Sequence, residues 1–323
     1  MALTLIENFR AVFYTPFYAA FARKAYEAEG VEVQRVMSTN PAETAQALRS
    51  GRGDVAWGGP IRLLLANNQQ PDSDLVIFCE VVRRDPFFLV GREPRPAWQL
   101  ADLLHGRVAT VSEVPTPWLC LQHDLRLAGL DPAHVRRIPD RSMPENLAAL
   151  RAGDIEVMQA FQPFVEQAVE EGVGHIWYAA AARGLTAYTS LYTTRQCMAR
   201  DPESLLRMTR AMYRTQQWIA THSAAELAAC VASFFPDLPR PTLTAALERY
   251  KTLRVWNRTP MLRPEGLAWL EAACRSGGYI QHSVPYEQCV DMRFAAQVIE
   301  EAPAAFDDDS GPEPLYAVPR GDQ

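Results

Sequence analysis

The sequence is poor in lysine, which limits the cofactor chemistry open to it. Its 32 basic residues include only two lysines, Lys24 and Lys251. Pyridoxal phosphate is normally held as a lysine Schiff base. Lys24 stands in a run typical of a solvated helix face, and Lys251 lies in a helical region far from any predicted strand end. We therefore expect no such cofactor.

Metal-ligand motifs and long apolar runs are also missing. The six cysteines show no C-x-x-C or other tight spacing, which argues against a zinc site and a disulfide framework. The six histidines show no H-E-x-x-H pattern. No apolar run approaches the ~20 residues that span a membrane. We expect no metal and no membrane segment, and we identify no catalytic residue.

Length and charge narrow the class of protein. A chain of 323 residues exceeds the usual size of a single core, so we expect two domains. A formal net charge of −6 argues against a nucleic-acid-binding protein, which would show a basic patch or stripe. The chain opens on Met-Ala and a predicted strand, with no charged and apolar leader. It is either cytoplasmic or has a signal peptide outside this sequence.

One stretch of the sequence occurs twice. Residues 47–57 read ALRSGRGDVAW and residues 149–159 read ALRAGDIEVMQ, at a constant offset of 102 positions. In each copy a predicted helix ends at a glycine, Gly51 or Gly153, which suits the left-handed conformation that follows many helices. Any two strand–helix units of an α/β protein resemble each other to some degree. A period this long nevertheless favours two similar α/β lobes whose strand-end loops face a shared cleft.

Alternating strand and helix patterns predict an open α/β architecture. Helices separate the predicted strands, which is typical of a mainly parallel sheet. From about residue 202 to residue 295 the pattern is helical. Residues 300–323 are acidic and rich in proline and glycine, so we expect a disordered or loosely docked tail. The predicted strands are 3–7, 31–36, 54–57 and 75–82, followed by 87–91, 107–111, 135–139 and 155–160.

Five segments carry a family resemblance: 15–33, 47–60, 81–90, 100–110 and 149–164. In this order and spacing they resemble the substrate-binding proteins of nitrate, sulfonate, taurine and thiamine-precursor ABC importers, and the related yeast-type pyrimidine synthase. The resemblance implies an α/β, two-lobed type II periplasmic-binding-protein fold. Each lobe would be a mainly parallel sheet flanked by helices, and hinge closure would enclose a small ligand. A periplasmic location and an ABC-importer permease as partner are also implied.

The resemblance also places the lobe boundaries. Lobe one is expected to comprise residues 1–86 and 187–295, and lobe two residues 87–186. The crossovers between them are expected near residues 82–86 and 186–189. We expect a monomer.

The candidate ligand-binding residues follow predicted strands or flank the crossovers. Ligands of open α/β sheets bind beyond the carboxyl ends of the strands, beside helix N-termini. Aromatic side chains there could form walls, and glycines would let the backbone approach a ligand. The same residue types also fill cores and cap helices. The candidates are the aromatics Phe13, Tyr14, Tyr18, Trp57, Trp118 and Tyr188, the glycines Gly58 and Gly59, the hinge residue Arg83, and the polar residues Ser112, Gln159 and Gln162.

Two functions are open on this fold: ligand binding without catalysis, and an enzyme such as the pyrimidine synthase or a decarboxylase-like relative. In the synthase branch a lysine and a histidine follow the strand that here begins near Asp54. Those positions hold Gly58 and Arg62 in this chain. The cysteine-rich run of that branch would fall at residues 184–194, which contain no cysteine. These departures favour binding over synthase activity.

The expected ligand is a small planar or heterocyclic metabolite, for example a thiamine-precursor-like pyrimidine. Sulfonate and nitrate binders usually present a small Gly/Ser-rich loop where this chain has residues 112–118, SEVPTPW. Proline lacks an N–H donor, and Glu113 would repel an anion. The aromatic residues near the predicted cleft favour a flat ring.

Overall fold

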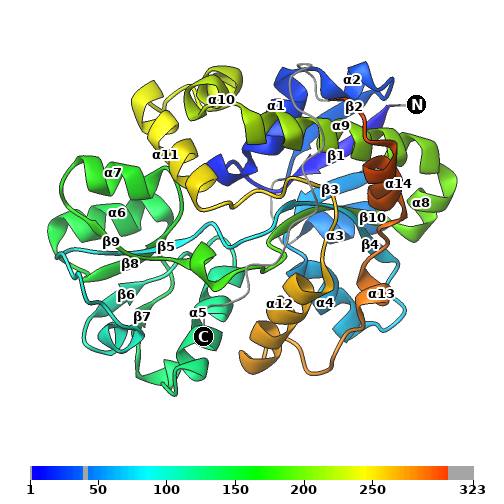
Figure 1. Ribbon diagram of the computed structural model, residues 1–323. Helices are drawn as coiled ribbons and strands as arrows, with labels where there is room; N and C mark the ends of the chain where they lie inside the picture. Colours follow the sequence, from blue (N-terminus) through cyan, green and yellow to red (C-terminus); the bar gives the residue numbers. More distant parts are fainter. Residues whose placement is uncertain (1, 39–42, 305–323) are drawn as a thin grey trace.

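Two five-stranded sheets form the frame of the molecule. The computed structural model describes residues 2–38 and 43–304 (Figure 1). The sheet of lobe one has the order β2-β1-β3-β10-β4, and the sheet of lobe two has the order β7-β6-β8-β5-β9. The strands of lobe one are β1 (Leu3–Glu7), β2 (Val33–Met37), β3 (Val55–Gly58), β4 (Leu75–Val82) and β10 (Thr189–Thr194). Those of lobe two are β5 (Phe88–Gly91), β6 (Arg107–Ala109), β7 (Arg136–Ile138), β8 (Val157–Ala160) and β9 (His175–Ala179).

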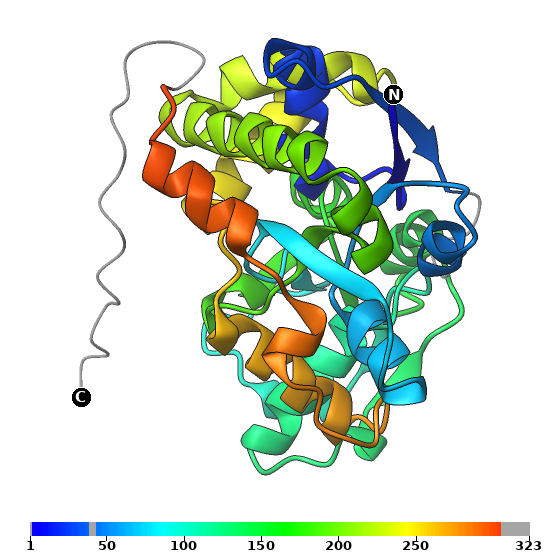
Figure 2. The same ribbon diagram turned by 90° about the vertical axis from the view of Figure 1, so that its right-hand side faces the viewer.

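Helices cover both faces of each sheet (Figures 1 and 2). In lobe two, α6 and α7 share a buried apolar cluster with one face of the sheet, and α5 shares another cluster with the opposite face. The helices up to the second crossover are α1 (Thr15–Ala22), α2 (Ala25–Ala28), α3 (Thr44–Arg49), α4 (Ile61–Gln69), α5 (Thr116–Leu127), α6 (Met143–Ala152) and α7 (Phe164–Glu170). Those that follow are α8 (Arg195–Arg200), α9 (Pro202–Thr221), α10 (Ala224–Val231), α11 (Arg240–Thr252), α12 (Pro264–Ser276), α13 (Tyr286–Cys289) and α14 (Arg293–Glu301).

The two-lobed α/β fold class is confirmed, and each sheet is mainly parallel with one antiparallel strand. In lobe one, β1 pairs in parallel with β2 and β3, whereas β10 runs antiparallel between β3 and β4. In lobe two, β6 pairs in parallel with β7 and β8, whereas β5 runs antiparallel between β8 and β9. The antiparallel strand of each sheet is the one that enters directly from the other lobe, so the crossovers themselves create the mixed topology.

The internal repeat corresponds to a structural repeat. β3 and β8 lie at the same offset as the sequence repeat, and each occupies the third position of its sheet order. Gly51 has a φ of +71° and Gly153 a φ of +78°. These values confirm the predicted left-handed conformation, which glycine adopts without a steric penalty. The same turn therefore leads from helix to strand in both lobes.

Two chain segments connect the lobes. The first, residues 83–87, leads from β4 to β5, and the second, residues 180–188, returns from β9 to β10. The buried Arg183 of the second segment forms ion pairs with Asp85 of the first segment and with Asp124 of α5. Burial raises the pKa of Asp85, and the charge of Arg183 opposes this shift. One guanidinium thus joins both crossovers to lobe two.

Helices of the two lobes also pack against each other. α12 of lobe one packs on α5 of lobe two, and α11 packs on α7 (Figure 1). Leu119 and Cys120 of α5 share a buried apolar cluster with Leu267 and Leu270 of α12. The lobes are therefore in contact, and residues 87–186 as an independent folding unit stay a prediction.

The C-terminal helix α14 packs on α9 and β4 (Figure 2). It includes Glu300 and Glu301, the first residues of the predicted tail. Residues 305–323 of that tail lie outside the described residues. Within residues 2–38 and 43–304, no helix combines the length and the apolar character needed to cross a membrane.

Candidate functional site at the lobe junction

Aromatic side chains from both lobes and both crossovers meet where the lobes touch. The ring of Phe13 lies 5.7 Å from that of Phe161 in lobe two and 6.2 Å from those of Phe87 and Tyr188 in the crossovers, centroid to centroid. Several of these contacts are edge-to-face, a favoured geometry for aromatic pairs. We call the following residues the aromatic cluster: Phe9, Phe13, Tyr14, Phe17, Trp57, Phe87, Phe161 and Tyr188.

A buried carboxylate shapes the loop that carries Phe13 and Tyr14. Glu7 ends β1 and its side chain is fully buried. It forms ion pairs with Arg10, at 3.0 Å, and with Arg35 of β2. It also accepts a 2.8 Å hydrogen bond from the hydroxyl of Tyr18. Because a buried charge needs such partners, these bonds fold the loop back over the sheet and direct its aromatic side chains to the junction.

Trp57 forms the inner layer of the aromatic cluster. Its indole stacks on Phe17 with a centroid separation of 4.5 Å and an interplanar angle of 14°. The Tyr14 ring lies 5.9 Å away. Trp57 is fully buried, and its Nε1 has no hydrogen-bond partner among the described residues. One face of the indole is thus covered by Phe17, and its N–H makes no hydrogen bond to the described residues.

A chain of polar groups runs beside the aromatic cluster. Arg62, in the first turn of α4, donates a 2.9 Å hydrogen bond to Oδ1 of Asn8. The amide of Asn8 donates a 3.0 Å bond to the hydroxyl of Tyr14. Burial raises the pKa of Tyr14 to about 12, and Asn8 and Arg62 oppose the shift. A Cβ at Gly58 would lie 2.9 Å from Nη1 of Arg62, so the guanidinium rests directly over this glycine.

Other buried polar atoms at the junction lack partners. Among the described residues, the hydroxyls of Tyr188 and Ser190 make no hydrogen bond. Burial raises the pKa of Tyr188 well above its usual value. Ser190 is fully buried in β10, opposite Gly58. Each unsatisfied buried group costs about 1–3 kcal/mol. With Nε1 of Trp57, they form a group of buried polar atoms that have no partner among the described residues.

Lobe two contains a separate group of polar side chains near the ends of β6 and β7 that the sequence analysis did not identify. Nε of Arg137 donates a 2.8 Å hydrogen bond to the hydroxyl of Thr110, just after β6. Asn146 of α6 donates to the Thr110 carbonyl at 3.2 Å, and its own Oδ1 has no partner among the described residues. Nη1 of Arg141 is also buried without a described partner. Thr110 and Arg141 follow strands β6 and β7, at the strand ends where ligands of α/β sheets bind, while Arg137 lies in β7 and Asn146 in α6.

Four of the predicted site residues belong to the aromatic cluster: Phe13, Tyr14, Trp57 and Tyr188. Tyr18 lies beside it, stacked on Phe234 at 4.8 Å with its hydroxyl bonded to Glu7. Gly58 and Gly59 lie under Arg62. Their contact with a ligand stays a prediction, but the structure brings these seven together.

The other predicted residues make different contacts. Both ends of the Gln162 amide bond to Glu166. Arg83 donates to the carbonyl of Arg254 at 3.3 Å. Trp118 is buried in a lobe-two apolar cluster with Arg137 over its ring, and Ser112 is exposed beside Glu113. Gln159 donates to the Pro117 carbonyl at 2.9 Å, which leaves its Oε1 without a described partner.

The described residues were expected to hold no metal site, and their cysteine thiols share one property. No group of three or more His, Cys, Asp or Glu side chains among the described residues is placed to hold a metal ion. Burial raises the pKa of all six cysteine thiols. A nucleophilic cysteine requires the opposite shift.

Two α/β lobes joined by two crossovers define the type II periplasmic-binding-protein fold. The periplasmic aliphatic sulphonate binding protein SsuA of Escherichia coli has this architecture: it is 17% identical, with a TM-score of 0.73 over 89% of this chain and 96% of that chain. The desulfurization enzyme DszB also superimposes, at 14% identity and a TM-score of 0.66, over 92% of this chain and 99% of that chain. The fold therefore serves both binding proteins and an enzyme.

A model of the NMT1-like family matches residues 9–233. The chain belongs to the NMT1-like family, which confirms the resemblance found in the sequence. Among curated proteins it is similar to the putative binding protein YtlA of Bacillus subtilis (strain 168). The two are 23% identical over 293 residues, which cover 90% of this chain and 88% of YtlA.

Proposed function

We propose that this chain is a solute-binding protein of the ABC-importer type that holds a small flat organic compound at the lobe junction. The aromatic cluster carries this proposal, because both lobes and both crossovers contribute rings to it. Flat aromatic walls favour a ring-shaped ligand. The similarity to the putative binding protein YtlA and the sulphonate-binding protein SsuA supports the same class of function. A monomer and a permease partner belong to the proposal.

The polar groups at the junction specify the ligand further. Nε1 of Trp57 can only donate a hydrogen bond, whereas the hydroxyl of Tyr188 can donate and accept. Arg62 adds a cation that is linked through Asn8 to Tyr14 of the aromatic cluster. A planar heterocycle with ring nitrogens or oxygen substituents would offer partners to Nε1 of Trp57 and the hydroxyl of Tyr188, and a thiamine-precursor-like pyrimidine is one such compound. Glu113 accepts a 3.1 Å bond from the Met143 amide, so its carboxylate is already engaged within lobe two.

The cysteine pKa shifts favour binding over a thiol-dependent enzyme. Each of the six thiols is buried or half-buried, with a raised pKa. None of the six belongs to the aromatic cluster.

The test begins with the protein purified without denaturation, from which bound compounds are released and identified by mass spectrometry. Affinity for the identified compound is then measured by calorimetry for three variants. Tyr188→Phe and Arg62→Gln should each weaken binding at least tenfold, or by about 1.4 kcal/mol. Tyr26→Phe is the matched control, since Tyr26 also has a buried hydroxyl without a described partner but lies in α2.

The stability of the variants separates ligand contact from structural damage. Removing a buried unpartnered hydroxyl should leave the ligand-free protein at least as stable in both tyrosine variants. The proposal fails if the released compound has no ring, or if Tyr188→Phe binds it as tightly as Tyr26→Phe does.

A further inference from the structure

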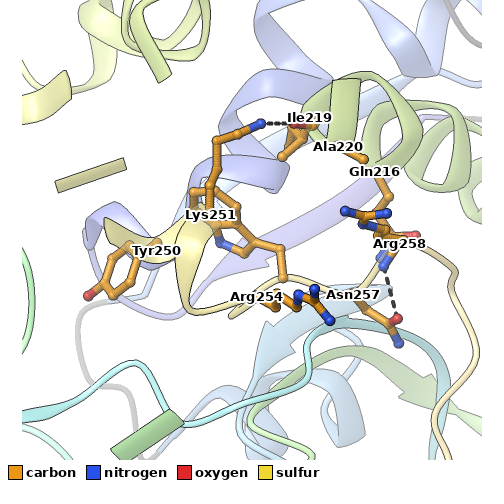
Figure 3. A pocket seen from close by; sticks show the side chains of 9 residues that line it. Gln216, Ile219, Ala220, Tyr250, Lys251, Arg254, Asn257 and Arg258 are labelled. Carbon is orange, nitrogen blue, oxygen red and sulfur yellow. Dashed lines mark hydrogen bonds between the residues drawn. The ribbon is translucent and has the colours of Figure 1, made fainter. Parts of the chain in front are cut away.

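A pocket lies in lobe one between α9, α11 and the segment that follows α11 (Figure 3). Its walls include Gln216 of α9, Lys251 at the end of α11, and Arg254, Trp256 and Arg258 of the following segment. All of these residues belong to lobe one, and none was predicted as part of a ligand site. The sequence analysis had placed Lys251 away from any site.

The pocket is basic. Three of its lining residues carry a positive charge, and no acidic side chain of the described residues lines it. Lys251 donates hydrogen bonds to the carbonyls of Ile219 and His222 at the end of α9. An ammonium has three hydrogens, so one stays available after these two bonds. Arginine and lysine side chains together are typical of sites for phosphate-like anions.

A buried acceptor faces the same pocket. Gln216 is 2% exposed, and its Nε2 donates a 2.8 Å hydrogen bond to the carbonyl of Glu80. Its Oε1 has no hydrogen-bond partner among the described residues. An amide oxygen only accepts hydrogen bonds. A ligand that matched all of these groups would carry negative oxygens, for the cations, and one hydrogen-bond donor, for Gln216.

We propose that this pocket binds inorganic phosphate. Near neutral pH inorganic phosphate retains a hydroxyl, which can donate to Oε1 of Gln216, while its charged oxygens face Lys251, Arg254 and Arg258. Sulfate has the same shape but no hydrogen at this pH. A phosphomonoester loses its last proton with a pKa of about 6 and is disfavoured for the same reason.

Two residues that line the pocket also form hydrogen bonds to the lobe junction. Tyr250, which lines the pocket, accepts a 2.9 Å hydrogen bond from the amide of Gln162 in lobe two and donates a 3.1 Å bond to the carbonyl of Pro86 in the first crossover. Nε1 of Trp256 donates a 2.8 Å bond to the carbonyl of Phe13. Phosphate bound here holds the segment that ties lobe one to the aromatic cluster, and it stabilises the fold by mass action.

The test measures binding of radiolabelled inorganic phosphate by equilibrium dialysis at pH 7.5, with sulfate as competitor. We expect one site per chain and at least tenfold weaker binding of sulfate. Arg254→Asn and Arg258→Gln should each weaken phosphate binding at least tenfold. Asparagine suits the first position because Arg254 has a φ of +53°, a conformation that asparagine tolerates. Gln216→Met should remove the preference for phosphate over sulfate.

The exposed Arg126 of α5 supplies a control of equal charge change, and Arg126→Gln should bind phosphate like the native protein. Circular dichroism checks that each variant is folded. The proposal is overturned if no saturable binding occurs at millimolar phosphate, if sulfate binds as tightly as phosphate, or if both arginine variants bind like Arg126→Gln.

Discussion

The two lobes share one chain path but differ in the chemistry at the ends of their matching strands. β3 of lobe one ends at Gly58 and is followed by Gly59, whereas β8 of lobe two ends at Ala160 and is followed by Phe161. In lobe two the ring of Phe161 enters the aromatic cluster. In lobe one the bare glycines leave the backbone open, and Arg62 lies over them.

This difference shows how a repeated frame can form an asymmetric site. The shared helix–turn–strand unit fixes where each loop begins, because both turns use a glycine with positive φ. The side chains after the strand are then free to differ. Lobe one supplies most rings of the aromatic cluster together with a cation and hydrogen-bonding groups, and lobe two adds the ring of Phe161. A ligand with a ring and an acceptor would match both halves.

The largest expected effect on the free energy of unfolding concerns the buried ion pairs of Arg183 with Asp85 and Asp124. Arg183→Leu leaves Asp85 and Asp124 without their partner, and breaking a buried ion pair in this way costs about 3–5 kcal/mol. Arg107→Gln is the control, because Arg107 pairs with Glu156 while both side chains are close to half exposed, at 45% and 46%. It should cost less than about 1 kcal/mol. Urea unfolding measures the free energy of unfolding of both variants. Equal losses would contradict the role of the buried Arg183 ion pairs.

The next effect on stability tests the difference between the ends of β3 and β8, where only β8 is followed by an aromatic residue. Phe161→Ala removes a ring that is 4% exposed and packed against Phe13 and Phe87, so the free energy of unfolding should fall by about 3 kcal/mol. Phe164→Ala, three residues later in α7, removes a partly buried ring and should cost about 1 kcal/mol. The two losses are compared in the same urea series. A smaller loss for Phe161→Ala than for Phe164→Ala would place Phe161 outside the junction core.

The third effect, on the pH dependence of stability, concerns the edge strands β4 and β9. β4 of lobe one is buried along its whole length, whereas β9 of lobe two is partly exposed. Burial raises the pKa of Glu80 in β4 from 4.5 to about 8, opposed by Arg83 and by a 2.5 Å hydrogen bond from Asn257. Between these two pKa values the folded chain keeps a proton that the unfolded chain has lost. Stability should therefore fall as pH rises through this range and level off above pH 8.

From pH 6 to pH 7.5 this one group should remove about 2 kcal/mol from the free energy of unfolding. Glu80→Gln should abolish that part of the pH dependence, because glutamine stays neutral in both states and can still accept the bond from Asn257. Parallel urea series at the two pH values measure the difference. An unchanged slope in Glu80→Gln would show that Glu80 ionises normally in the folded protein.

The sequence predicted those features of the fold that depend on local pattern. The repeat located the two lobes, and the glycines at its turns adopt the expected conformation. Strands β9 and β10 were not predicted. β9 is short and partly exposed, and the threonine-rich β10 lacks polar alternation because it is buried on both faces.

The site was predicted in part, because some of its residues can be recognised from local pattern. Phe13 and Tyr14 follow the first predicted strand and Trp57 is the last residue of the third, so position at a strand end was enough to select them. Phe161 was passed over in favour of its polar neighbours, Gln159 and Gln162, although it follows β8 directly and its ring joins the aromatic cluster. Contacts between residues far apart in the chain could not be predicted from the sequence.

Arg83 illustrates the limit imposed by such contacts. It resembled a ligand-binding cation at the hinge, but it bonds to the carbonyl of Arg254, 171 positions away. Arg62 is the opposite case, since only its contact with Asn8, 54 positions away, brings it to the site. Neither contact could be predicted from the spacing of residues in a single sequence.

Hydrogen exchange tests the central claim, that one ligand is held by both lobes, most directly. Exchange is followed by mass spectrometry in the protein with its co-purified compound and after the compound has been removed. We predict that the compound slows exchange together in the loop after β1, in residues 57–62 of lobe one, and in residues 161–166 of lobe two. Slowing confined to one lobe, or absent from all three segments, would contradict a ligand site at the lobe junction.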